Sequence, residues 1–250
     1  MRKGNGLMAH SSRFYRQRGI RYLATGNINE AIYDLSEAIF LDARSPQAYC
    51  YRGLAYLREG DLGSSLADLS RALQLHPQHA KAYYQRARVY QRMRSWGSAL
   101  QDVNQALALD PQYGKAYHLR ARLHFHQGYI DAAIDDFGAC LARFPACASA
   151  YLNRGIAYQH QGVYARAIQD YTQAIALKPQ LARAYNYRGV SHYHLGNLAA
   201  AFVDFHQAYQ LAPHNPWVVR NYTHCYAEIL DTQKMSPSSA NYQTLLGGKG

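Results

Sequence analysis

Residues 148–181 read ASAYLNRGIAYQHQGVYARAIQDYTQAIALKPQL, and this stretch decides the fold. It contains two segments with apolar residues at helical spacing, one around Tyr151 and one around Tyr171. Gly162 lies between them, where the left-handed end of a helix favours a residue without a β-carbon. Pro179 follows the second segment and disfavours helix in the residue before it. The stretch therefore predicts two helices joined by a tight turn.

The same pattern recurs every 34 residues, six times in succession, without insertion or deletion. A fixed period of this length indicates a stacked array in which each unit buries its apolar face against its neighbour. The expected fold class is all-α, a right-handed α-solenoid of tandem helix hairpins. We expect a flexible segment at 1–11, units at 12–45, 46–79, 80–113, 114–147, 148–181 and 182–215, a capping helix at 216–231 and a flexible tail at 232–250.

The fifth unit also shows a family resemblance. Its order of aromatic, Gly or Ala, aromatic, Ala, aromatic, Ala and Pro resembles the tetratricopeptide repeat family, and the match extends over 12–215. The chain departs from the commonest pattern by using Tyr for Trp at the first aromatic and Arg for Leu before the Gly or Ala. The residues that carry the pattern are Tyr151, Gly155, Tyr158, Ala167, Tyr171, Ala174 and Pro179.

Arginine and aspartate form two further registers with the same period. The arginine precedes the small residue of the first helix and the aspartate precedes a packing residue of the second, so both lie beside the interface between helices. We interpret them as a structural ladder of ion pairs within or between units, and not as catalytic groups. The ladder residues are Arg18, Asp34, Arg52, Asp68, Arg86, Asp102, Arg120, Asp136, Arg154, Asp170, Arg188 and Asp204.

The first helices of this family line a concave groove, so the resemblance implies a binding surface here. Its exposed places are the second, fifth, sixth, ninth, twelfth and thirteenth of each unit. The chain has 27 basic and 16 acidic residues and a net charge of +11, yet no acidic residue falls on these places. The groove is therefore expected to be strongly basic. Its basic residues are Arg13, Arg16, Arg58, Lys81, Arg88, Arg92, Lys115, Arg122 and Arg183.

Histidine extends the same surface at the thirteenth place. Successive units carry Arg58, Arg92, His126, His160 and His194 there. Neighbouring helices pack about 8 to 10 Å apart, which is too far for equivalent side chains to share a zinc ion at about 2 Å from each nitrogen. We therefore expect no metal site, and predict a row of hydrogen-bonding groups along one rim of the groove.

A known binding mode of the family clamps a partner's terminal carboxylate with Lys, Asn and Arg from three consecutive first helices. The nearest match here comprises His118, Arg122, Asn153, Arg183 and Tyr187, of which only Asn153 agrees in type and place. The match does not assign that mode, although an acidic extended peptide suits the charges. Apolar and stacking contacts would come from Tyr51, Tyr84, Leu119, Phe125, Leu152, Tyr187 and Tyr193.

The C-terminal part predicts one more helix after the sixth unit. Tyr222, Cys225 and Ile229 lie on the side that a second helix would have covered, so we expect an exposed apolar patch there. The helix either only caps the array or also serves self-association. Cys140 is expected to be a small apolar filler of the fourth unit.

Other motifs exclude several functions. The chain shows no nucleotide-binding glycine loop, no metal-ligand helix motif and no nucleophile elbow, so we predict no enzymatic activity and no cofactor. No apolar run approaches the roughly 18 residues of a membrane span. The N-terminal segment lacks the apolar stretch of a signal peptide, and the four cysteines show no paired spacing. These features predict an intracellular, cytoplasmic protein.

The function predicted from the sequence is that of a non-enzymatic adaptor or assembly scaffold. Its ligand would be an acidic segment of a partner protein, held by charge and aromatic contacts in the groove. Single-stranded nucleic acid is the alternative ligand, because Arg and Tyr in one groove also suit phosphates and bases. A third reading is a structural subunit of a larger complex that uses its outer face and C-terminal end.

Overall fold

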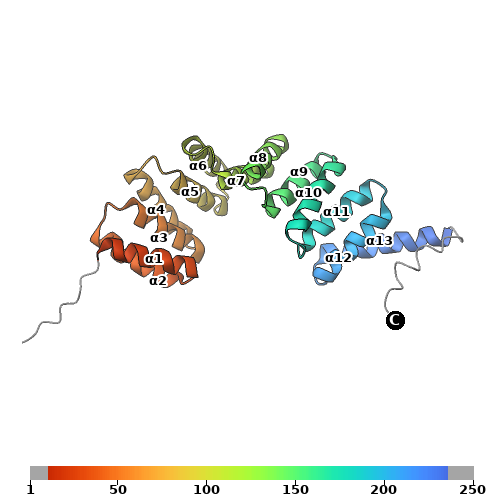
Figure 1. The fold of residues 1–250 in the computed structure, drawn as a ribbon, viewed down its shortest axis with the longest axis horizontal. Coiled ribbons are helices and arrows are strands. Elements are labelled where there is room, and N and C mark those ends of the chain that lie inside the picture. Colours follow the sequence, from red (N-terminus) through yellow and green to blue (C-terminus); the bar gives the residue numbers. More distant parts are fainter. Residues whose placement is uncertain (1–10, 236–250) are drawn as a thin grey trace, which may run out of the picture. The chain divides into compact units, whose positions relative to one another are not determined.

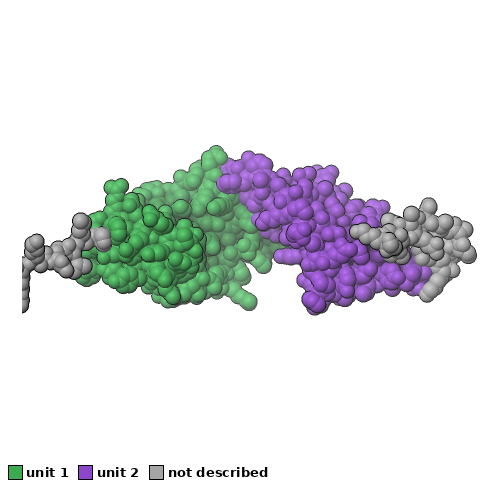
Figure 2. Space-filling model, turned by 60° about the horizontal axis from the view of Figure 1, so that its bottom comes forward, with its two compact units in different colours: residues 1–127 green, residues 128–250 purple. Residues whose placement is uncertain are grey.

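The computed structural model describes residues 11–235, and all regular secondary structure within that range is helical (Figure 1). The chain divides into two compact units, Met1–Gln127 and Gly128–Gly250 (Figure 2). The first unit contains α1 (Ser12–Thr25), α2 (Ile28–Leu41), α3 (Pro46–Glu59), α4 (Leu62–Leu75), α5 (Ala80–Arg92), α6 (Trp96–Leu109) and α7 (Gly114–His126). The second contains α8 (Ile130–Arg143), α9 (Ala148–His160), α10 (Tyr164–Leu177), α11 (Ala182–His194), α12 (Leu198–Leu211) and α13 (Pro216–Met235).

Each of the six repeats therefore supplies two helices, and a left-handed residue turns the chain between them. Gly162, for example, has φ 74° between α9 and α10. In the third repeat the same place is held by Arg94 with φ 60°, which is the one left-handed residue other than glycine in the described part of the chain. The period is thus preserved even where glycine is absent.

Side-chain caps begin several of the helices. Ser11 Oγ accepts a hydrogen bond from the backbone N–H of Phe14 at 3.3 Å, and Asp61 Oδ1 accepts one from Ser64 at 3.0 Å. Such caps satisfy backbone donors that have no partner within the helix. Ser11 therefore belongs to the folded array, which corrects its assignment to a flexible segment at 1–11. Residues 1–10 lie outside the described residues.

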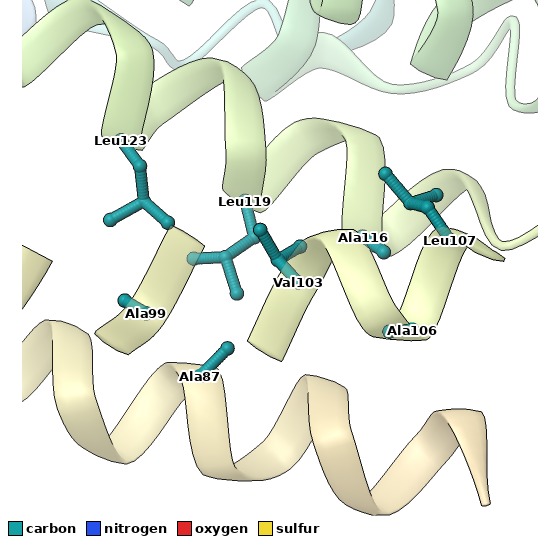
Figure 3. Close-up of a cluster of buried hydrophobic side chains, with 8 residues drawn as sticks. All are labelled: Ala87, Ala99, Val103, Ala106, Leu107, Ala116, Leu119 and Leu123. Atoms are coloured by element: carbon teal, nitrogen blue, oxygen red, sulfur yellow. The ribbon is translucent and has the colours of Figure 1, made fainter. Parts of the chain in front are cut away.

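Small and large residues face each other where the two helices of a repeat meet. A β-carbon added to Gly155 would lie 2.6 Å from the ring of Tyr171, so that ring occupies the space a side chain would need. Between repeats, the core cluster that includes Ala87, Val103 and Leu119 draws on three successive helices. Figure 3 shows Leu119 of α7 reaching toward Val103 of α6, with Ala87 of α5 nearby. The third repeat is thus covered by the first helix of the fourth.

The arginine and aspartate registers meet inside individual repeats. Arg86 Nε donates to Asp102 Oδ2 at 2.7 Å, and Arg86 Nη2 donates to Asp102 Oδ1 at 2.8 Å. The aspartates of these pairs are only 1% to 6% exposed. Arg120 and Asp136 belong to different units. The other ion pairs of this kind are Arg18–Asp34, Arg52–Asp68, Arg154–Asp170 and Arg188–Asp204.

The same arginines also reach back to the preceding repeat, a link that sequence reasoning missed. Arg52 Nη1 donates to Ser36 Oγ at 3.0 Å, and Arg188 Nη1 donates to Thr172 Oγ1 at 3.0 Å. Each such guanidinium thus joins two repeats through its planar set of donors. Equivalent bonds run from Arg86 to Ser70 and from Arg120 to Asn104.

The last helix is longer than predicted. α13 continues to Met235, which corrects the predicted end at residue 231. No glycine or proline interrupts residues 231–235, so the sequence allows the helix to continue through them. Residues 236–250 of the expected tail lie outside the described residues.

The apolar side of α13 is also placed differently from our expectation. Cys225 is fully buried and Ile229 is 9% exposed, because both pack with Ala201 and Phe205 of α12. The predicted exposed patch at these residues is therefore wrong. α13 turns this side onto the sixth repeat and thereby covers the end of its stack.

Candidate binding groove

A pocket of about 420 Å³ lies in the first unit among the first helices α1, α3 and α5. Nine of its ten lining residues occupy the second, fifth, sixth or ninth place of their repeat, and the tenth is His79. The volume lies in the range of roughly 300 to 1,000 Å³ found for ligand sites. The lining residues are Arg16, Gln17, Ile20, Gln47, Cys50, Tyr51, Leu54, His79, Lys81 and Gln85.

Two cations stand at this pocket, and the protein holds both in position. Arg16 Nη1 donates to Ser45 Oγ at 3.2 Å, and Lys81 Nζ lies 6.0 Å from the centre of the Tyr51 ring. No carboxylate is among the lining residues. The pocket thus combines apolar side chains, such as Leu54, with positive charge that no acidic group within it neutralises.

Burial favours the neutral forms of two further lining residues, Cys50 and His79. Burial raises the pKa of the Cys50 thiol to about 11, although the nearby charge of Lys81 acts in the opposite direction. Burial, together with the charges of His76 and Lys81, lowers the pKa of His79 below its usual 6.5. The positive charge therefore comes from Arg16 and Lys81.

His79 is the lining residue that lies at none of the six predicted groove places, and Gln17, Ile20, Gln47, Cys50, Leu54 and Gln85 were predicted by place only. The Nδ1 atom of His79 accepts a hydrogen bond from the backbone N–H of Ala82 at 3.1 Å, so its side chain caps the start of α5. The helix-cap place lies outside the six groove places because it precedes the first helix. In the preceding repeat that place holds Ser45, a common capping residue, which was the available signal.

The two arginines at the thirteenth place form hydrogen bonds to the preceding repeat. Arg58 Nη1 donates to the carbonyl oxygen of Leu23, and Arg92 Nη1 donates to that of Leu57 at 2.6 Å. Both acceptors belong to the first helix of the preceding repeat. These guanidinium groups are exposed in part, but they bind carbonyl groups near the end of a helix, where backbone acceptors lack intrahelical partners.

The histidines at this place also contact the preceding repeat. His126 stacks on Trp96 with ring centres 5.4 Å apart, and His194 stacks on Tyr164 at 4.7 Å. His160 is the exposed last residue of α9. His126 and His194 thus contact the neighbouring repeat, and a binding role for this row of hydrogen-bonding groups stays a prediction.

The remaining basic candidates lie on the first helices of their repeats. Arg88 Nη1 donates to Gln85 Oε1 at 2.7 Å, and its guanidinium lies 6.0 Å from the Tyr84 ring centre. The ring of Tyr84 in turn packs against that of Tyr113, with ring centres 4.9 Å apart. Lys115 on α7 is exposed. Three further basic candidates, Arg13, Arg122 and Arg183, are also exposed.

The set nearest to the family's carboxylate clamp is divided between the two units. His118 and Arg122 lie on α7, whereas Asn153, Arg183 and Tyr187 belong to the second unit. In that unit the guanidinium of Arg183 lies 5.8 Å from the Tyr187 ring centre. Tyr187 also packs against Trp217 of α13 at 6.2 Å. Tyr187 is therefore part of the contact with the last helix.

Two general features bear on the kind of site. No helix in residues 11–235 is both long and apolar enough to cross a membrane. Among the described residues, no group of three or more His, Cys, Asp or Glu side chains is arranged to hold a metal ion. The basic pocket among α1, α3 and α5 is the candidate ligand site considered below.

Sequence profiles of a single family match most of the chain. Profiles described as tetratricopeptide repeat match residues 52–124, 128–182 and 152–216, and one described as TPR repeat matches residues 19–60. Together with the helical repeats these matches identify the class. The chain belongs to the tetratricopeptide repeat (TPR) family.

Solved structures show the same fold. The PilF structure from Pseudomonas aeruginosa has a TM-score of 0.77 at 19% identity, over 87% of this chain and 97% of that one. YrrB is described as a TPR protein with an unusual peptide-binding site. Its structure has a TM-score of 0.64 at 18% identity, and the match covers 74% of this chain and 96% of YrrB.

A subunit of a larger assembly also resembles the chain. The Cut9–Hcn1 hetero-tetramer of APC/C gives a TM-score of 0.75 at 17% identity, over 86% of this chain. The present chain spans only 42% of the length of that one. A sequence search of curated proteins found no match. At these identities the likeness to solved structures shows the fold alone.

Proposed function

We propose that this protein is a non-enzymatic adaptor or assembly scaffold that binds an acidic segment of a partner protein in the groove of its first unit. The observation that carries the proposal is the pocket among α1, α3 and α5, which has Arg16 and Lys81 at its surface and no carboxylate in its lining. An anionic ligand gains from both charges, whereas a cationic ligand meets no partner within the pocket.

The polar lining further favours an extended peptide. Gln17, Gln47 and Gln85 each carry an amide that both donates and accepts, so they suit the exposed N–H and C=O groups of an extended backbone. The apolar side chains of Ile20 and Leu54 suit a hydrophobic residue of the same peptide. We therefore expect a ligand that carries Asp or Glu next to an apolar side chain.

The comparisons are consistent with this proposal. YrrB is described as having a peptide-binding site, and Cut9 is part of a hetero-tetramer. Both share the fold of this chain, and neither is described by a catalytic activity. A binding role therefore agrees with the described pocket, which combines a basic surface with neutral Cys50 and His79.

Single-stranded nucleic acid is the alternative ligand, and the aromatic contacts argue against it. Binding without sequence preference depends on bases stacking on free aromatic faces. Here Lys81 lies over Tyr51, and Arg88 lies over Tyr84. A base would have to displace these cations, whereas an acidic peptide binds them where they stand.

Charge reversal in the pocket tests the proposal. Binding of a fluorescent Glu-rich peptide would be measured by anisotropy for the wild type, for Lys81→Glu and for Arg16→Glu. We expect each pocket variant to bind about tenfold or more weakly, because it replaces an attraction by a repulsion. Arg71→Glu is the matched control, since Arg71 is exposed on α4 and does not line the pocket. Equal loss in Arg71→Glu would show that net charge alone governs binding and would contradict the proposal.

A further inference from the structure

The outer side of α2 exposes an unusual amount of apolar surface. Phe40 is 83% exposed, Tyr33 is 63% exposed and Leu41 is 49% exposed. Tyr33 and Phe40 are seven residues apart, so they lie on one side of the helix, and Glu30 and Glu37 lie three residues before each of them. We call Glu30, Tyr33, Glu37, Phe40 and Leu41 the α2 face.

The fold of a repeat does not require the two aromatic residues. The same places hold Ala67 and Gln74 in the second repeat and Gln101 and Ala108 in the third. Those repeats form the same pair of helices without any large apolar side chain there. An exposed aromatic pair confined to one repeat marks an interaction surface, because burying large apolar side chains is what stabilises association.

The charge of α2 indicates what kind of surface would cover it. The helix carries Glu30, Asp34 and Glu37 and no lysine or arginine. Asp34 is already paired with Arg18, which leaves Glu30 and Glu37 beside the exposed rings. The complementary surface is therefore basic, with space for an aromatic side chain.

The same unit of this chain carries such a surface. We propose that the α2 face of one copy docks in the α1–α3–α5 groove of a second copy, with Phe40 entering the pocket and the glutamates meeting Arg16 and Lys81. This inference rests on the proposed function, since it uses the same groove and names a second copy of the chain as its ligand. The pocket of about 420 Å³ accommodates a phenyl ring, and its basic side chains match the acidic flanks of that ring.

The contact would join two different surfaces. A docked pair then keeps one free α2 face and one free groove, so further copies add head to tail and form rings or open assemblies. The net charge of +11 opposes the association of copies, so assembly is expected to depend strongly on protein concentration.

Two complementary variants of the full chain test the docking. The face variant carries Tyr33→Ala and Phe40→Gln, which are the residues of the second repeat at the same places. The groove variant carries Arg16→Glu and Lys81→Glu. Sedimentation equilibrium would measure the mass of each variant and of their equimolar mixture over a range of concentrations, with circular dichroism as the check on folding.

The docking makes a specific prediction for these samples. The wild type should gain mass as its concentration rises, and each variant alone should associate about tenfold or more weakly. The mixture should form a dimer and nothing larger, because only the groove of the face variant and the α2 face of the groove variant remain intact. A monomeric wild type, a face variant that associates like the wild type, or a mixture without dimers would each overturn the inference.

The peptide experiment separates this inference from the proposed function. The face variant keeps its groove and should bind the Glu-rich peptide as the wild type does. If the wild type binds the peptide but stays monomeric, only the inference of self-docking fails. If it self-associates as predicted but does not bind the peptide, the proposal of an acidic partner segment fails instead.

Discussion

Arg154 and Asp170 meet through two parallel hydrogen bonds, from Nε to Oδ2 at 2.9 Å and from Nη2 to Oδ1 at 2.8 Å. The Asp170 side chain is 6% exposed, whereas that of Arg154 is 23% exposed. Removing the arginine therefore leaves a buried carboxylate without its partner. We expect Arg154→Ala and Asp170→Ala each to lower the free energy of unfolding by about 1 to 4 kcal/mol, measured by urea denaturation.

Arg122→Ala is the control for this prediction. Arg122 is exposed, so its removal should change the free energy of unfolding by less than about 0.5 kcal/mol. If all three substitutions change the free energy of unfolding negligibly, the Arg–Asp pairs do not stabilise the array.

Gly138 stands at the place where other repeats carry a hydrogen-bond acceptor for the arginine of the next repeat. Other arginines of the ladder donate to Ser, Asn or Thr of the preceding repeat, whereas Arg154 faces Gly138, whose added β-carbon would lie 3.7 Å from Arg154 Nη1. Gly138→Ser should supply the missing acceptor within ordinary contact distance. We expect the free energy of unfolding, measured by thermal unfolding, to rise by about 1 to 2 kcal/mol, because serine has the better helix propensity and adds a hydrogen bond.

Gly138→Ala separates the two contributions. Alanine has a higher helix propensity than glycine but offers no acceptor. Gly138→Ala should therefore raise the free energy of unfolding by only about 0.5 to 1 kcal/mol. If Gly138→Ala proves as stabilising as Gly138→Ser, the serine does not bond to the arginine.

Arg94 holds a turn conformation that disfavours side chains. Its φ of 60° costs a residue other than glycine about 1 kcal/mol or more, so Arg94→Gly should raise the melting temperature. Gly162→Ala is the reverse change, and no atom lies within 4 Å of its added β-carbon, so its expected loss comes from the backbone alone. A lower melting temperature for Arg94→Gly would show that the arginine side chain stabilises the turn.

His79 should make stability depend on pH. Its pKa in the folded protein lies below the 6.5 of the unfolded chain, mainly because of burial. The unfolded chain therefore binds more protons just below that pH, and the free energy of unfolding falls as the pH drops through about 6.5. His79→Asn keeps an acceptor for the helix cap and does not titrate, so its melting temperature should fall less between about pH 7 and about pH 5.

His214→Asn provides the comparison for this pH series. His214 is exposed and does not line the pocket, so this variant controls for the loss of a histidine elsewhere in the chain. A His79→Asn protein with the same dependence as the wild type would exclude His79 as the source.

The repeated features of the fold were predictable from the sequence because each recurs in at least five of the six repeats. The turn at Gly162 and the registers of Arg154 and Asp170 follow from the 34-residue period, which reflects contacts between neighbouring repeats. The places of Lys81 and Tyr51 beside the groove were implied by the resemblance to the tetratricopeptide repeat family.

The period does not predict which contacts the side chain at an equivalent place makes in each repeat. Arg58 and His126 occupy the same place, yet one donates to a backbone carbonyl and the other stacks on Trp96. The pocket in the first unit depends on the side chains of three particular helices, including the capping His79, and not on the period. The end of α13 likewise has no repeat to define it.

The measurement that tests the central claim most directly is a competition for the groove. A fluorescent Glu-rich peptide bound to the full chain would be challenged with single-stranded RNA of equal charge and, separately, with unlabelled peptide. Because both ligands are anionic, their binding weakens alike as salt screens the charges, so the comparison is made at one salt concentration. The account predicts that unlabelled peptide displaces the probe at lower concentration than the RNA does. Displacement by RNA at an equal or lower concentration would contradict it.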